Sequence, residues 1–222
     1  MRRMRRALAL LLGTVVLAAA ASAAAATTPK LTQLILRPGQ VGPGYGLFQR
    51  SDGHGVRGQV TLNLCGSDYP SESRRLTRLQ TNYLRSGTTL GISNEVVTYR
   101  PGGAAQAMRE VIQHALHCPH HPVDSGVNGL PKLLFVITRL KHAHLLKGYL
   151  AVRIKASGTI NGKHVSQTSY AVYQRRGDVF SGVYSFGPSG DAGQLRLCLH
   201  AAEQSALNLR QGGTSSPSGP TA

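Results

Sequence analysis

The sequence is poor in acidic residues: it has nine, against 25 lysines and arginines, so its 222 residues carry a formal charge of +16. It also lacks tryptophan and has only three cysteines. The hydrophobic content of 41% is ordinary for a globular protein, and the length favours one domain with a sizeable core. The positive charge favours solubility and anionic partners, although many surface arginines can also simply reflect genome composition.

Motifs that identify common catalytic sites are also missing. No G-x-S-x-G elbow occurs, and no pair of carboxylates stands out among the nine acidic residues. Gly102 and Gly103 precede a predicted helix, but no Lys-Ser or Lys-Thr follows them, so we interpret them as a turn rather than a phosphate-binding loop. Aromatic residues are not interleaved with basic ones as in proteins that stack on nucleic-acid bases. We therefore predict no catalysis, no cofactor and no nucleic-acid partner.

Long apolar runs are absent after the N-terminus. There, four arginines precede an apolar, alanine-rich run that contains Ala21-Ser22-Ala23, a pattern typical of a secretory signal peptide over residues 1–26. Because the run approaches the roughly 20 residues that span a bilayer, an uncleaved anchor is the alternative. We expect a secreted protein, extracellular or associated with the cell wall. One domain would cover residues 27–211, followed by a disordered Gly/Ser/Pro/Thr-rich tail over residues 212–222.

The first half of the predicted domain contains a compact unit that begins with a strand and a helix. Alternating apolar residues from Val60 to Leu64 indicate a strand that ends at Cys65. A helix from Pro70 to Arg85 is predicted next, because proline suits a first helical position and the apolar residues share one side of a helical wheel. That side carries Leu76, Leu79 and Tyr83, together with Glu72. The opposite side carries Arg74, Arg78 and Arg85.

The rest of the chain is rich in predicted strands. Asn161-Gly162 lies between alternating segments and is a strong signal for a two-residue hairpin, because both residues accept positive φ. Predicted strands cover residues 45–49, 92–99, 133–140, 149–160, 164–175 and 179–186, and predicted helices cover residues 104–117 and 191–210. The fold class is therefore α+β, with a central antiparallel sheet that forms a meander in the C-terminal half, flanked by about three main helices.

The odd number of cysteines leaves one without an intramolecular partner. Export favours oxidation, and Cys65 and Cys118 end a predicted strand and a predicted helix. Cys198 falls within an apolar helical stripe, where a free thiol packs as a small hydrophobic group. We therefore predict a Cys65–Cys118 disulfide and a free Cys198.

Several short motifs together resemble a known family. They are Leu34-Ile35-Leu36-Arg37-Pro38 with Gly42-Pro43-Gly44-Tyr45, Leu64-Cys65-Gly66 with Tyr69-Pro70-Ser71-Glu72 and Arg75, Glu95-Val96-Val97-x-Tyr99, Gly102-Gly103-Ala104, and Cys118-Pro119. The combination resembles exported actinobacterial proteins that look related to the extracellular sensor domain of mycobacterial receptor Ser/Thr kinases. The resemblance implies a sheet flanked by helices, one cleft, and ligand sensing rather than catalysis. Cys65 and Cys118 match the position of that family's strand-to-helix disulfide. The chain lacks a kinase domain and the family's second cysteine pair.

Two groups of residues are candidates for a binding or metal site. The stripe of Arg74, Arg78 and Arg85 is a candidate surface for an anionic cell-wall polymer or membrane, with a merely solvated helix face as the alternative. Histidines cluster around Cys118 in a pattern that invites a zinc interpretation, although an oxidised cysteine cannot be a ligand, so we predict no metal. These histidines are His114, His117, His120 and His121.

Glu72 is the one carboxylate on a predicted apolar side. We expect it to accept hydrogen bonds near Ser71 or to pair with an arginine such as Arg75, and a functional carboxylate is the alternative. The leading functional hypothesis is a secreted, non-catalytic domain that binds an unknown small ligand at the cell envelope. The alternatives are a small secreted hydrolase that uses the His114–His121 region and a structural wall-associated protein.

Overall fold

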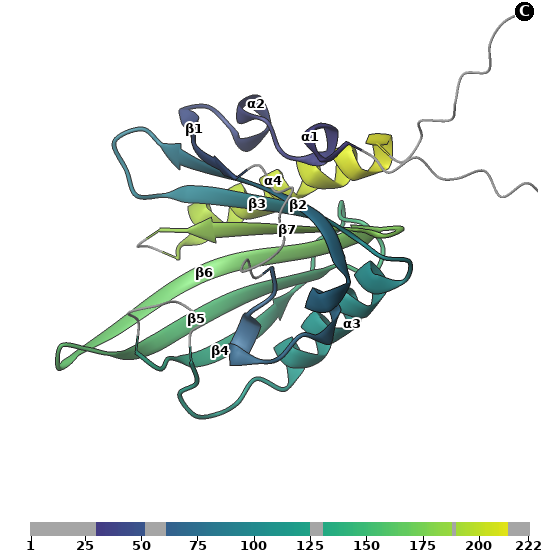
Figure 1. The fold of residues 1–222 in the computed structure, drawn as a ribbon. Coiled ribbons are helices and arrows are strands. Elements are labelled where there is room, and N and C mark those ends of the chain that lie inside the picture. Colours follow the sequence, from purple (N-terminus) through teal and green to yellow (C-terminus); the bar gives the residue numbers. More distant parts are fainter. Residues whose placement is uncertain (1–29, 52–60, 125–130, 188–189, 213–222) are drawn as a thin grey trace, which may run out of the picture.

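The structure is a computed structural model that describes residues 30–51, 61–124, 131–187 and 190–212 (Figure 1). Its centre is a seven-stranded antiparallel sheet with the strand order β1-β2-β3-β7-β6-β5-β4. The strands are β1 (Tyr45–Ser51), β2 (Arg75–Arg85), β3 (Gly91–Tyr99), β4 (Leu134–Leu140), β5 (Leu150–Ile160), β6 (Lys163–Arg176) and β7 (Val179–Phe186). This architecture confirms the predicted α+β class.

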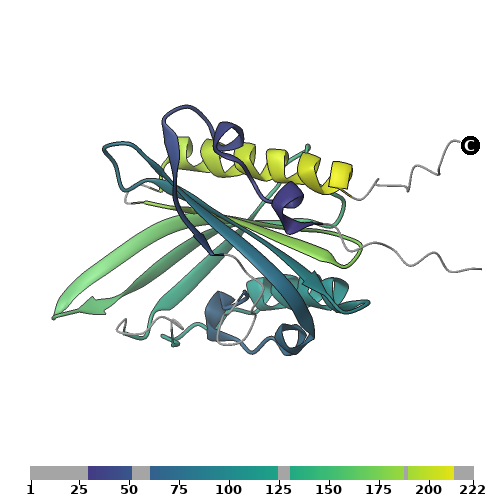
Figure 2. The same ribbon diagram turned by 45° about the horizontal axis from the view of Figure 1, so that its top comes forward.

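Helices cover both faces of the sheet. Figure 2 shows α4 on one side with α1 and α2, and α3 on the other side with two short 3-10 segments, η1 and η2. The helices are α1 (Leu31–Leu34), α2 (Pro38–Val41), α3 (Gly103–Leu116) and α4 (Ala192–Gly212), and the 3-10 segments are η1 (Leu64–Gly66) and η2 (Pro70–Arg74). We call the two sides of the sheet the α3 face and the α4 face.

Strand alternation divides the core between the two faces, because successive side chains of a strand point to opposite sides. The α3 face packs against the apolar side of α3, and its buried residues include Val97, Tyr99, Met108, Val111, Val152, Tyr173 and Phe180. The α4 face packs against α4, and its buried residues include Tyr83, Ile92, Ala151, Val172, Val183, Cys198 and Ala202. The same strands therefore support two separate hydrophobic layers.

The α3 helix is too short to cover its face of the sheet. Its 14 residues span about 21 Å at 1.5 Å per residue, whereas the 14 residues of β6 span about 46 Å at 3.3 Å per residue. In Figure 1, α3 lies toward the right of the sheet, while the β5–β6 hairpin extends to the left. Part of the α3 face is consequently not covered by α3.

The C-terminal half agrees closely with the prediction. Strands β4, β5, β6 and β7 pair antiparallel in chain order, which is a meander. At the tip of the β5–β6 hairpin, Asn161 and Gly162 have φ values of 50° and 74°, as the predicted two-residue turn requires. The final helix extends from Ala192 to Gly212 and buries Cys198 against the α4 face.

The helix predicted from Pro70 to Arg85 is wrong. Only Pro70–Arg74 forms a 3-10 turn, and Arg75–Arg85 is strand β2, paired with β1 and β3. Leu79 and Tyr83 both lie on the α4 face of the sheet, just as they shared one side of the predicted helix. Residues spaced by four share a face of a strand as well as a face of a helix, so this spacing did not distinguish the two structures.

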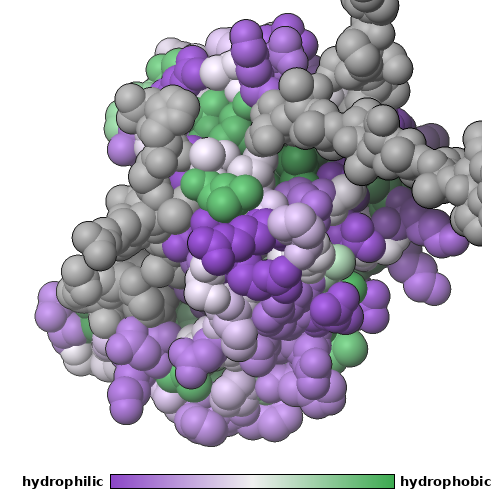
Figure 3. Space-filling view, turned by 45° about the vertical axis from the view of Figure 1, so that its right-hand side comes forward, coloured by the Kyte–Doolittle hydropathy of each residue, from purple (hydrophilic) through white to green (hydrophobic). Residues whose placement is uncertain are grey.

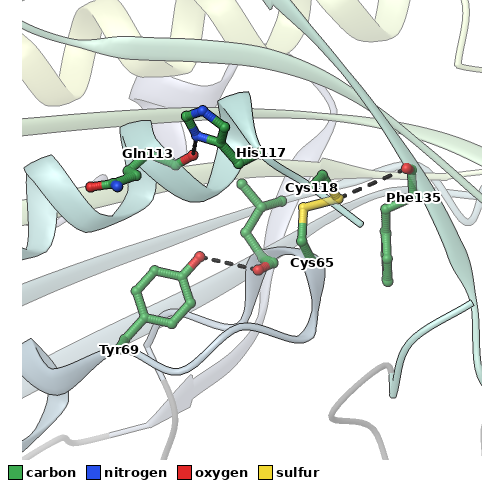
Figure 4. Close-up of a disulfide and its surroundings, with 7 residues drawn as sticks. Cys65, Tyr69, Gln113, His117, Cys118 and Phe135 are labelled. Carbon is green, nitrogen blue, oxygen red and sulfur yellow. Dashed lines mark hydrogen bonds between the residues drawn. A yellow bond between two sulfur atoms is a disulfide. The ribbon is translucent and has the colours of Figure 1, made fainter. Parts of the chain in front are cut away.

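The strand predicted to end at Cys65 is also wrong in its described part, where Leu64–Gly66 forms a 3-10 turn. Val60 lies outside the described residues. The predicted disulfide is confirmed, since Cys65 and Cys118 are bonded with their Cα atoms 5.4 Å apart (Figure 4). It joins η1 to the residues that follow α3, and the adjacent Tyr69 hydroxyl donates to the carbonyl of Leu64 at 3.1 Å. The disulfide thus fixes η1 against the end of α3.

The predicted signal peptide over residues 1–26 and most of the predicted tail over residues 212–222 lie outside the described residues. Within residues 30–51, 61–124, 131–187 and 190–212, no helix has the length and apolar character needed to cross a membrane.

Candidate functional site

A cleft of about 400 Å³ opens on the α3 face, where the first three strands and β7 extend past α3. We call it the polar cleft. Its lining consists of Phe48, Thr61, Asn63, Gln80, Asn82, Leu84, Ser93, Glu95, Tyr184 and Phe186. Apolar walls with a few convergent polar groups, in a volume of roughly 300–1,000 Å³, are typical of small-molecule sites.

Two glycines shape the floor of the polar cleft by allowing aromatic rings to lie on the sheet. A Cβ atom at Gly182 would come within 2.3 Å of the Tyr184 hydroxyl oxygen, and one at Gly91 would come within 2.1 Å of the Phe186 ring. Gly91 is the cross-strand partner of Phe186. The hydroxyl of Tyr184 is buried and has no hydrogen-bond partner among the described residues.

A buried ion pair lies at the back of the polar cleft. Arg78 Nε donates to Glu95 Oε1 at 2.6 Å, and only about 3% of each residue is exposed. Thr61 Oγ1 donates to the same carboxylate oxygen at 3.1 Å. Arg78 Nη2 donates to Gln80 Oε1 at 2.8 Å, and Gln80 Nε2 donates in turn to Ser93 Oγ at 2.9 Å. This chain of hydrogen bonds holds the polar lining in fixed orientations.

Burial raises the pKa of Glu95, although the neighbouring Arg78 guanidinium acts in the opposite direction. Burial likewise raises the pKa of Glu72, against the hydrogen bond from the Thr61 amide and the charge of Arg75. Glu72 Oε2 lies 3.2 Å from Arg75 Nη2, which confirms the expected arginine partner. Both carboxylates therefore belong to arginine-paired structural networks.

A second hollow, of about 560 Å³, adjoins the polar cleft at Phe186 and extends toward the β5–β6 hairpin. We call it the apolar hollow. Its lining consists of Thr89, Leu133, Ala156, Ser157, Ile160, Val165, Ser166, Gln167, Phe186 and Gly187. Phe186, at the end of β7, is common to both linings.

The three arginines predicted as one anion-binding stripe are not brought together. Arg78 is buried against Glu95, and Arg74 donates from Nη1 to Gln106 Oε1 of α3 at 2.9 Å. Arg85 is exposed at the end of β2, beside Tyr45 of β1. Because the segment is a strand rather than a helix, Arg78 and Arg85 point to opposite faces of the sheet. Of the three, Arg85 alone presents an exposed side chain to an anionic surface.

Of the histidines near Cys118, His114 and His117 make contacts with neighbouring residues. The His114 ring lies edge-on to Tyr69, with the ring centroids 4.9 Å apart. His117 Nδ1 lies 2.9 Å from the Gln113 carbonyl oxygen, as Figure 4 shows. His120 and His121 are exposed, and Cys118 is in the disulfide. In the part of the chain that the structure describes, no group of three or more His, Cys, Asp or Glu side chains is placed to hold a metal ion.

The side of the molecule turned forward in Figure 3 is covered mainly by hydrophilic residues, interrupted by small hydrophobic patches. Such a surface suits contact with water or with a polar polymer. It contrasts with the polar cleft and the apolar hollow, where Phe48, Leu84, Ile160 and Val165 present apolar side chains.

Comparison with known proteins gives a match in structure. The sequence matches no protein-family model and no curated protein. The fold matches the extracellular domain of PknH from Mycobacterium tuberculosis with a TM-score of 0.52 and 10% sequence identity, over 78% of this chain and 93% of that chain. The chain is similar in fold to that extracellular domain. This agrees with the architecture expected from the resemblance to extracellular sensor domains.

Sequence reasoning did not find the residues of the polar cleft. Gln80 and Asn82 share one face of β2, and Ser93 and Glu95 share the same face of β3, but the intervening Thr81 and Asn94 are also polar, so the alternation in the sequence is weak. Polar residues at every second position of two adjacent strands mark a face that is not filled by a helix. The misassigned helix over residues 70–85 concealed half of this pattern.

Proposed function

We propose that the protein is a secreted, non-catalytic binding domain with a sensor-like role at or outside the cell envelope, and that the polar cleft is its ligand site. Support comes from the fold shared with an extracellular domain and from the disulfide, which is typical of proteins that mature in oxidising compartments. The ligand is a small molecule whose polar groups meet the amides and hydroxyls of β2 and β3.

The main support for this proposal is the construction of the polar cleft. The polar cleft combines oriented hydrogen-bonding groups with partly exposed aromatic walls, and its back is held rigid by the Arg78–Glu95 pair. A rigid site loses little conformational freedom when a ligand binds, so more of the interaction energy appears as affinity. Such a site needs neither a nucleophile nor a metal.

The proposal is tested by screening soluble envelope glycans and lipids for an increase in melting temperature. A ligand that binds only the folded state stabilises it by about 2.7 kcal/mol at a concentration 100 times its dissociation constant. For a domain of this size we expect a rise of several degrees, and the ligands found are then titrated by calorimetry.

Adjacent residues of β1 provide a matched pair of variants. Phe48 is 69% exposed and lines the polar cleft, whereas Leu47 is 49% exposed and is absent from its lining. Phe48→Ala should weaken ligand binding at least fivefold, and Leu47→Ala should leave it unchanged. Equal effects of the two variants would count against the polar cleft as the site.

Attraction to an anionic wall polymer or membrane surface is a further part of the proposed role. Its support is the formal charge of +16, which falls by four to +12 without the arginines of the predicted signal peptide, and the exposed position of basic residues such as Arg50, Arg85 and Arg153. This attraction would concentrate the protein at the envelope, whereas the polar cleft would select the ligand.

A further inference from the structure

The polar cleft and the apolar hollow lie side by side on the α3 face and differ in chemistry. Gly91 lets the Phe186 ring lie on the sheet where the two linings meet. A ligand that crosses this ring would contact both linings at once. Such a ligand would need one polar end for the polar cleft and one apolar end for the apolar hollow.

The apolar hollow is lined mainly by hydrocarbon, although polar residues, among them Ser157, Ser166 and Gln167, contribute to its lining. Ser157 and Ser166 are cross-strand partners, and alternation directs their side chains to the α4 face. Ile160 and Val165 point to the α3 face. Gln167 points there too, but its Nε2 donates to the Gly187 carbonyl at 3.2 Å, so that its amide is already used. The side chains that remain for a ligand are mainly hydrocarbon.

The lining of the polar cleft carries hydrogen-bonding groups but no unbalanced charge. Among the described residues that line it, Glu95 is the one charged residue, and Arg78 pairs with it at 2.6 Å. No described lining residue of either hollow is a lysine or an arginine, the side chains that best match a phosphate or a carboxylate.

Several polar groups of the polar cleft already make hydrogen bonds within the protein. Gln80 bonds Arg78 and Ser93, and Asn82 Nδ2 donates to Gln49. Among the described lining residues, the Asn63 amide, the Asn82 carbonyl oxygen and the Ser93 hydroxyl hydrogen remain for a ligand. With the aromatic wall, these groups suit an uncharged head group that is rich in hydroxyls.

We propose that the ligand is an uncharged glycolipid, whose sugar head group occupies the polar cleft and whose hydrocarbon chain crosses Phe186 into the apolar hollow. This inference rests on the proposed function and specifies its ligand. Each methylene group buried in the apolar hollow contributes about fourfold to affinity. The Tyr184 side chain forms part of the lining that would hold the head group.

The test uses octyl and decyl β-maltoside below their micelle-forming concentrations, with maltose and decyl sulfate as comparisons. We expect saturable binding that strengthens about 15-fold from octyl to decyl, with much weaker binding of maltose and of decyl sulfate. Ile160→Thr combined with Val165→Thr should remove most of the gain from chain length. Val136→Thr, on the exposed side of β4, is the matched control and should have no effect.

Three results would overturn the inference: equal affinity for maltose and decyl maltoside, equal affinity for the sulfate and the maltoside, or no maltoside binding at all. Binding of any probe that is weakened by Phe48→Ala but not by the Ile160 and Val165 changes would refute the glycolipid while leaving the polar cleft as the ligand site. Circular dichroism and the melting temperature of each variant establish that the fold is retained.

Discussion

Removing the positive partner of the buried ion pair tests the structure of the polar cleft. In Arg78→Met, the Glu95 carboxylate keeps its burial and loses the guanidinium 2.6 Å away. An unpaired buried charge costs about 3–5 kcal/mol, out of the roughly 5–15 kcal/mol that stabilise a typical domain. At about 2–4 °C per kcal/mol for a domain of this size, we expect the melting temperature at neutral pH to fall by roughly 6–20 °C.

The loss of stability in Arg78→Met should increase as the pH rises. Burial already raises the pKa of Glu95, and Arg78 opposes that rise, so removing Arg78 must raise the pKa further. A carboxyl group whose pKa is higher in the folded state favours folding when it is protonated, and this contribution disappears as the pH rises through the folded-state pKa. The stability lost in Arg78→Met should therefore be large at about pH 8 and much smaller at about pH 5.

The measurement is urea unfolding followed by circular dichroism at the two pH values. Arg85→Met is the matched control, because Arg85 lies on the same strand but is exposed, and its loss should cost no more than about 0.5 kcal/mol at either pH. Replacing both members of the pair, as in Arg78→Met with Glu95→Leu, should restore much of the stability. A deficit that is independent of pH, or a double variant as unstable as Arg78→Met, would refute the reasoning.

Three further predictions concern the cysteines and the charge. Replacing Cys118 by alanine opens a link between residues 53 apart in sequence and should cost about 4 kcal/mol in urea unfolding, whereas an unchanged midpoint would contradict the role of the disulfide. The Cys198 thiol is buried, and burial raises its pKa to about 12, so its alkylation, monitored by mass spectrometry, should require unfolding. Rapid alkylation of the native protein would show that α4 does not cover this thiol. Retention on anionic vesicles should fall with added salt, since exposed charges are screened beyond about 8 Å at physiological ionic strength, and Arg85→Glu should reduce it; retention that is unaffected by salt would exclude an electrostatic origin.

The parts of the fold that were predicted correctly have unambiguous local signals. The strands of the C-terminal meander alternate regularly, and Asn161-Gly162 specifies the β5–β6 turn. The α3 and α4 helices have apolar residues at helical spacing over three turns or more. The pairing of Cys65 with Cys118 was predicted from export, from their positions at element ends and from the place of Cys198 in a predicted apolar stripe, and the family resemblance implies the same pair.

Strand β2 was missed because tertiary pairing decides its structure. The four-residue spacing of Leu79 and Tyr83 fits a helix as well as a strand, and the charged Arg78 is buried only because it pairs with Glu95 of the neighbouring strand. No local pattern contains that partnership, since the two residues lie 17 positions apart. The polar cleft was missed for the same reason, because it forms where α3 ends and β2, β3 and β7 continue.

The location of the bound ligand is the most direct test of the central claim, and amide chemical-shift mapping measures it. Using whichever ligand raises the melting temperature, we predict that the largest shifts fall on Asn82, Ser93 and Phe186, with none at Thr138 on the far edge strand β4. Shifts that cluster instead around His117, or along the α4 helix, would contradict the assignment of ligand binding to the polar cleft.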